Sequence, residues 1–149
     1  MRILFTLLII TVTSCSAVSQ NPVSWNFSAR KIADKTYEVK LVATIQKGWH
    51  LYSQTQPEDA IAIPTEILFT KNPLLNLDGK IREQGKMEKF HDKTLDLSAN
   101  QYSEKVEFVQ VVKVKASAKT NVSGTVEYQT CNDEKCLPPR KINFSVSLN

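Results

Sequence analysis

The stretch YEVKLVATI, residues 37–45, has the clearest periodic pattern in the sequence, because apolar side chains occupy every second position along it. Tyr37, Val39, Leu41, Ala43 and Ile45 form this apolar set. A period of two places all five on one face of an extended chain. The stretch therefore predicts a β-strand with one face turned toward a core.

Similar short apolar segments recur on both sides, and turn residues such as Gly48 and Asp78-Gly79 separate them. The best helical spacing, that of Met87, Phe90 and Leu97, lies within residues 84–98 and predicts either a short helix or an irregular loop. The other predicted strands are residues 25–29, 49–53, 65–70, 75–81, 106–114, 122–129 and 142–148.

About eight short strands predict an all-β, immunoglobulin-like sandwich. A chain of 149 residues with 42% hydrophobic and 23% charged residues is long enough for one ordinary domain, which excludes a multidomain enzyme and a disordered chain. The four glycines form no phosphate-binding pattern, which disfavours nucleotide enzymes. The net charge of +4 comes from basic and acidic residues mixed along the chain, so we expect no nucleic-acid partner.

The first 19 residues are predicted to be a secretory signal peptide that precedes a domain of residues 20–149. A basic start is followed by an apolar run at residues 3–12 and by small polar residues. Ten apolar residues span only about 15 Å as a helix, too short for a permanent membrane anchor. Residues 12–15, VTSC, resemble a bacterial lipobox that would place a lipid on Cys15, whereas residues 17–19, AVS, fit ordinary cleavage. Both alternatives predict an exported protein.

In either case Cys15 is not a free cysteine of the folded domain, because it is removed with the signal peptide or carries a lipid. Cys131 and Cys136 are the two cysteines that remain. An oxidising compartment would allow these two to form a disulfide in a loop between two predicted strands. Such a local pair is accessible to the thiolate of a second protein and suits thiol-disulfide exchange, although it also fits a purely structural loop disulfide. Lys135 favours the thiolate of the adjacent Cys136, and Pro138 stiffens the chain just beyond it.

Three strings, YQTC at residues 128–131, CLPP at 136–139 and GWHLY at 48–52, resemble the N-terminal periplasmic domain of the thiol-disulfide interchange protein DsbD. The resemblance runs from about residue 22 to residue 148 and implies an immunoglobulin-like domain with a reversible Cys131–Cys136 disulfide and no cofactor. It implies that Cys136 exchanges with partners and that Cys131 resolves the mixed disulfide. The neighbours it implies are His50, Tyr52 and Tyr128.

The resemblance also implies a cap over the disulfide, with Phe90, Leu95 and Leu97 as candidates. Its implied partners are thioredoxin-like periplasmic disulfide proteins and a membrane electron donor. Full-length family members continue into membrane-spanning and thioredoxin-like regions, so this chain is expected to be a stand-alone module with a separate donor. Two departures are His50, where the family has a tyrosine, and a spacing of four residues between the cysteines where the best-known members have five.

Two other functions fit the sequence. A secreted or lipid-anchored β-sandwich could bind a ligand without catalysis and keep the disulfide only for stability. A metal-handling domain is the third, but two cysteines with the distant His91 beside Asp92 form a weak zinc pattern, so no metal site is predicted. The thiol-disulfide exchange module, with protein-disulfide reductase activity, is the function that the sequence favours.

Overall fold

The computed structural model describes residues 21–94, 96–115 and 119–148. The predicted signal peptide with Cys15, and the predicted cap residue Leu95, lie outside the described residues. An apolar helix of membrane-spanning length does not occur in the three described ranges.

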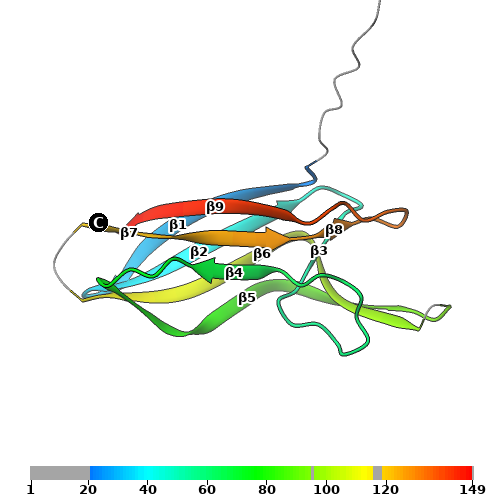
Figure 1. The fold of residues 1–149 in the computed structure, drawn as a ribbon, viewed down its shortest axis with the longest axis horizontal. Helices are drawn as coiled ribbons and strands as arrows, with labels where there is room; N and C mark the ends of the chain where they lie inside the picture. Colours follow the sequence, from blue (N-terminus) through cyan, green and yellow to red (C-terminus); the bar gives the residue numbers. More distant parts are fainter. Residues whose placement is uncertain (1–20, 95, 116–118, 149) are drawn as a thin grey trace, which may run out of the picture.

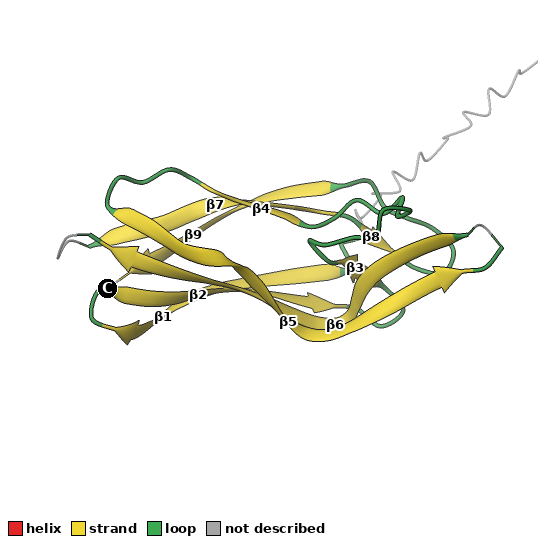
Figure 2. Cartoon of the chain, turned by 90° about the horizontal axis from the view of Figure 1, so that it is seen from below, coloured by secondary structure: helices red, strands yellow, loops and turns green. Residues whose placement is uncertain are grey.

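The described residues form nine strands in two antiparallel sheets that face each other (Figures 1 and 2). The larger sheet has the order β1-β2-β6-β3-β8, with β5 also paired to β6, and the smaller sheet has the order β4-β7-β9. The strands are β1 (Val23–Ala33), β2 (Thr36–Ile45), β3 (His50–Tyr52), β4 (Glu66–Phe69), β5 (Leu75–Asp92), β6 (Leu97–Val114), β7 (Thr120–Tyr128), β8 (Thr130–Cys131) and β9 (Arg140–Leu148).

The predicted all-β sandwich is confirmed, and each predicted strand has a counterpart. The expectation for residues 84–98 was wrong, because this segment is neither a helix nor a loop along most of its length. It extends β5 and begins β6, with Phe90 opposite Ala99 and His91 opposite Ser98. The helical spacing of the apolar residues in this segment was misleading. Most side chains of the hairpin are exposed, so the alternation of apolar and polar residues that marks a half-buried strand is missing.

The core lies between the sheets and contains the alternating side chains of β2 that the sequence predicted. Val39, Leu41 and Ala43 are fully buried, and they meet Val126 and Phe144 of the smaller sheet in one apolar cluster. Trp25 joins the same cluster, with its ring centroid 5.8 Å from Phe108 and 5.3 Å from Tyr128. Interdigitated apolar faces of this kind hold two sheets together without a disulfide between them.

Strand β6 positions the candidate site because it extends beyond the part that pairs with β2. Its residues 105–113 pair with β2, whereas residues 101–102, nearer its start, pair with β3. The opposite edge of β6 pairs with β5 along almost its whole length. The β5–β6 hairpin therefore projects at the end of the molecule where β3 and β8 lie (Figures 1 and 2).

A bulge in this hairpin falls at Gly85, where the pairing register shifts before Met87. A Cβ atom at Gly85 would stand 3.0 Å from the Lys105 carbonyl oxygen and 3.2 Å from the Tyr102 ring. A glycine at this position lets the backbone of β5 approach β6 closely while the strand bends.

Candidate functional site

Cys131 and Cys136 form a disulfide across a tight turn, with their Cα atoms 4.0 Å apart. Asn132 builds the turn, because its side-chain oxygen accepts hydrogen bonds from the backbone N–H of Glu134 (3.0 Å) and of Lys135 (2.8 Å). The Asn132 N–H donates in turn to the Lys135 carbonyl at 2.9 Å. The two sulfurs are thus carried by a locally ordered hairpin.

The two cysteines differ in their access to solvent. Cys131 is only 4% exposed and packs against Tyr52 and Ala99 in a small apolar cluster. Cys136, on the far side of the turn, is exposed. A molecule that approaches from solvent therefore reaches Cys136 more readily than Cys131.

A pocket of about 300 Å³ opens beside Cys136. Phe90 and Leu97, two of the predicted cap residues, line it from the β5–β6 hairpin, and Tyr52 lines it from β3. Phe90 is 49% exposed and so does not belong to the core. The structure thus brings Phe90 and Leu97 beside the disulfide, and the pocket is large enough to admit a small group or side chain.

The loop after β3 supplies the pocket residues Ile61 and Ala62 and is fixed by a hydrogen-bond network. Glu83 of β5 is its centre, accepting from the Ser53 hydroxyl (2.7 Å), the Gln54 backbone N–H (2.6 Å) and the Tyr102 hydroxyl (2.6 Å). Burial and the neighbouring Glu83 carboxylate raise the pKa of Tyr102 above its usual value. Tyr102 therefore remains a hydrogen-bond donor at neutral pH.

His50 lies directly opposite Cys131 in the pairing of β3 with β8. Side chains of opposed residues leave the same face of a sheet, so His50 and Cys131 share a face with Tyr52, two residues along β3. Burial raises the pKa of Tyr52, which keeps its phenol neutral beside the sulfur.

Three other predicted site residues lie outside the pocket. Tyr128 is 1% exposed and belongs to the core cluster, with its hydroxyl 3.3 Å from the Asn21 side chain. Lys135 and Pro138 are exposed, before and after Cys136. The structure therefore gives Tyr128 a packing position and gives Lys135 and Pro138 positions on the chain that flanks Cys136.

Sequence reasoning missed Gln129, which lines the pocket and joins two loops. Its side-chain N–H donates to the Leu137 carbonyl at 3.2 Å, and its side-chain oxygen accepts from the Ile63 N–H at 3.4 Å. This residue therefore holds the chain just after Cys136. Its place in the YQTC string was the available signal.

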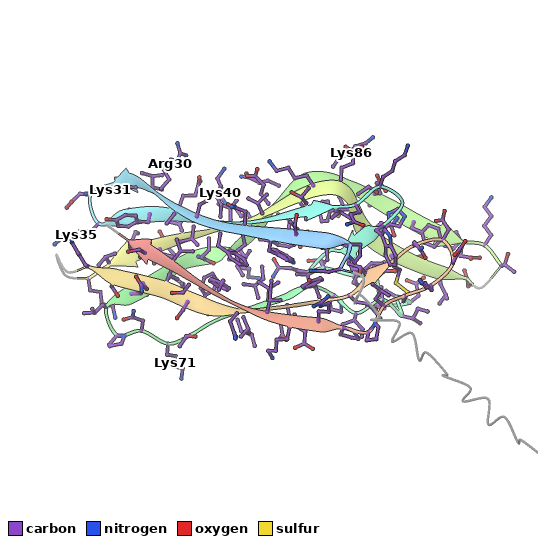
Figure 3. All side chains as sticks on the ribbon, turned by 90° about the horizontal axis from the view of Figure 1, so that it is seen from above. Arg30, Lys31, Lys35, Lys40, Lys71 and Lys86 are labelled. Carbon is purple, nitrogen blue, oxygen red and sulfur yellow. A yellow bond between two sulfur atoms is a disulfide. The ribbon has the colours of Figure 1, made fainter. Side chains whose placement is uncertain are left out.

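The basic side chains of Arg30, Lys31, Lys35 and Lys71 lie toward the end of the sandwich away from the sulfurs (Figure 3). Among the described residues, no group of three or more His, Cys, Asp and Glu side chains is arranged to hold a metal ion. The groups that line the pocket beside the disulfide are the Tyr52 phenol, apolar side chains, and the polar side chains of Asp92, Ser98 and Gln129. The apolar part of this lining suits the binding of an apolar surface.

Solved structures share this fold over most of the chain. The reduced N-terminal domain of DsbD from Neisseria meningitidis has a TM-score of 0.50 and 20% identity, covering 79% of this chain and 81% of that one. The complex of the DsbD and PilB N-terminal domains from the same species gives 0.52 and 15%, covering 83% and 80%. The N-terminal periplasmic domain of ScsB from Proteus mirabilis gives 0.50 and 16%, with 85% of this chain and 44% of that one covered.

No curated protein sequence is significantly similar to this chain. The family described as "Thiol:disulfide interchange protein DsbD, N-terminal" matches residues 16–148, which include every described strand and both cysteines of the disulfide. The chain therefore belongs to the family of the N-terminal domain of the thiol:disulfide interchange protein DsbD.

Proposed function

We propose that this protein is a thiol-disulfide exchange module that passes reducing equivalents to partner proteins through a reversible Cys131–Cys136 disulfide. The observation that carries the proposal is the unequal exposure of the two cysteines, with Cys136 exposed and Cys131 only 4% exposed. Exchange needs one sulfur that a partner can reach and a second that is close enough to complete the reaction. A purely structural disulfide needs neither feature.

In the proposed reaction the Cys136 thiolate attacks a partner disulfide. A bond forms between Cys136 and one partner sulfur, and the other partner sulfur leaves as a thiolate with the electron pair. The Cys131 thiolate then attacks the Cys136 sulfur, which restores the disulfide and expels the second partner thiolate. The module loses two electrons, the partner gains them, and the partner thiolates take up the two protons that the cysteines release.

The partners we propose are thioredoxin-like disulfide proteins. One structure with this fold is a complex of a DsbD N-terminal domain with the PilB N-terminal domain, so a fold of this type can dock another protein domain. The pocket beside Cys136 gives such a partner an apolar surface to contact. Phe90 and Leu97 would act as a cap that a partner displaces, together with Leu95.

We further propose that the module works in the periplasm and receives electrons from a separate membrane protein. Family membership and the signal-like residues 1–19 support this location. A donor must reduce the Cys131–Cys136 disulfide after each turnover, because every reduced partner leaves the module oxidised.

Trapping of mixed disulfides tests the assigned roles. Reduced Cys131→Ala should form a covalent complex with an oxidised thioredoxin-like protein, because Cys136 attacks and nothing resolves the product. Reduced Cys136→Ala should form none and should show no turnover. Non-reducing gel electrophoresis and intact mass measure both results, and release of the complex by dithiothreitol is the control.

The opposite pattern, with trapping only in Cys136→Ala, would reverse the two roles. If neither variant forms a complex while the native module also fails to reduce the partner, the disulfide is structural and the protein is a non-catalytic β-sandwich.

A further inference from the structure

A chain of three polar side chains crosses the sheet face that carries Cys131. The His50 Nδ1 atom lies 3.0 Å from the Ser103 Oγ, and the Ser103 hydroxyl donates to a Glu88 carboxylate oxygen at 3.0 Å. The three residues come from adjacent strands, β3, β6 and β5. His50 stands at the end of this chain nearest Cys131, its directly opposed partner.

The hydrogen bonds define the proton positions on the imidazole. Ser103 has one hydroxyl proton, and a carboxylate can only accept, so that proton points to Glu88. The Ser103 oxygen must then accept from His50, which places a proton on Nδ1 and leaves Nε2 with the free electron pair in the neutral ring. The chain thus fixes the tautomer in which Nε2 is the base.

The position of this base matters because Cys131 has little access to water. Opposed residues of an antiparallel pair have Cβ atoms about 5 Å apart, which places the imidazole within side-chain reach of the Cys131 sulfur. A thiol with 4% exposure cannot readily give its proton to solvent. A neighbouring side-chain base would remove this obstacle.

The charged groups around His50 are compatible with that role. Lys105, close to Ser103 in β6, is held by Glu107 at 2.7 Å. Glu88 is the carboxylate connected to His50 through Ser103. The other titratable residues of these elements are Tyr52 in β3, Asp78, Lys80, Arg82, Glu83, Lys86, Lys89, His91 and Asp92 in β5, Tyr102, Glu104 and Lys113 in β6, and Asp133, Glu134 and Lys135 in the cysteine turn.

We propose, on the basis of the proposed exchange function, that His50 accepts the Cys131 thiol proton when Cys131 resolves a mixed disulfide. The Cys131 S–H bond breaks and the proton moves to Nε2. The resulting thiolate attacks the Cys136 sulfur, and the partner thiolate leaves with the electron pair of the broken bond. The proton passes from the imidazolium to that thiolate or to water. Ser103 and Glu88 are positioning residues that orient the ring.

The experiment separates the two chemical steps with 5,5′-dithiobis(2-nitrobenzoate). Added in less than equimolar amount to the reduced protein, it releases one coloured thiolate when Cys136 attacks and a second when Cys131 resolves the adduct. His50→Gln should slow the second release by about 100-fold at pH 7 and change the first release less than about twofold. Stopped-flow absorbance between pH 5 and 9 measures both rates.

Glu88→Gln keeps an acceptor for Ser103 but removes the charge. It should slow the second release and leave the first unchanged, because the glutamine amide can also donate to Ser103, and the serine proton then no longer has to point away from His50. A purely structural role for Glu88 would leave the ratio of the two release rates unchanged. His91→Gln is the matched control, since His91 also pairs with a serine, Ser98, at 3.1 Å, but points to the hairpin face opposite Phe90.

A second release in His50→Gln that keeps the wild-type rate and pH profile would overturn the role of His50 while leaving the exchange function intact. Loss of the second release in the native protein would instead overturn the exchange function. Thermal melting of each variant shows whether it is folded. Ser103→Ala removes the hydrogen bond that fixes the proton on His50 Nδ1, so it should slow the second release to an intermediate extent.

Discussion

At the scale of single residues, burial distinguishes two cysteines that have only four residues between them in the sequence. Cys131 ends β8 and packs under Tyr52, whereas Cys136 follows the Asn132 turn into solvent. The sequence could predict the pair and the charge of Lys135. The burial of Cys131 depends on Ala99 and Tyr52, which arrive from two other strands, so no local pattern revealed its extent.

The reduction potential of the cysteine pair should be above about −300 mV, in the range of exchanging rather than structural disulfides. The physical reason is that Cys136 is exposed and open to attack by small thiols and proteins. Equilibration with glutathione or dithiothreitol buffers, followed by mass analysis of alkylated cysteines, measures the potential. A value well below this limit would identify the bridge as structural.

Tyr102 should make stability depend on pH in the alkaline range. Burial and the Glu83 carboxylate raise its pKa above the ordinary value of about 10, so the folded state holds the phenolic proton more tightly than the unfolded chain. The stabilisation is complete below about pH 10 and is lost as pH rises through the raised pKa of the folded state.

Tyr102→Phe should therefore lower the free energy of unfolding by about 2 kcal/mol at pH 7 and weaken its fall above pH 10. Urea unfolding from pH 7 to pH 11 measures both effects. Tyr128→Phe is the matched control, because its buried hydroxyl contacts the Asn21 side chain and not a carboxylate. An alkaline loss of stability that is identical in Tyr102→Phe and wild type would contradict this prediction.

At the scale of elements, the β5–β6 hairpin extends the larger sheet and brings side chains beside the disulfide. One face of its tip carries Glu88 and Phe90, and the other carries Met87. The sequence predicted the cap residues through a family resemblance but not the strand, because the tip is exposed on both faces and lacks a period of two. The meeting of Glu88, Ser103 and His50 was also unpredictable, since it depends on strand register after a bulge.

Phe90→Ala should increase the alkylation rate of Cys136 in the reduced protein several-fold, because Phe90 lines the pocket beside that sulfur. Its melting temperature should change by no more than about 2 °C, since the side chain is 49% exposed. Met87→Ala is the matched control, being 43% exposed on the opposite face of the same hairpin. Iodoacetamide kinetics followed by mass spectrometry measure the rates, and equal rates in both variants would refute the cap.

At the scale of the whole molecule, the described chain begins at the end of the sandwich where the disulfide lies. Asn21 contacts Tyr128, which is three residues before Cys131. The span from Cys15 to Asn21 is six residues, at most about 20 Å when fully extended. A lipid on Cys15 would therefore hold the disulfide close to a membrane surface, where a membrane electron donor could reach it.

The intact mass of the protein isolated from cells tests this arrangement. We expect loss of the signal segment, with cleavage either before Cys15 or near Ser19, because residues 1–19 have the basic, apolar and small-residue order of an exported precursor. A lipid increment on Cys15 would identify the anchored form, and Cys15→Ala should then release the protein from the membrane fraction. A mass that retains Met1 would contradict export.

An unlipidated start near Ser19 would instead make the module free to diffuse. Reduction by a membrane donor would then depend on collision, and its rate would fall in proportion to the dilution of the module.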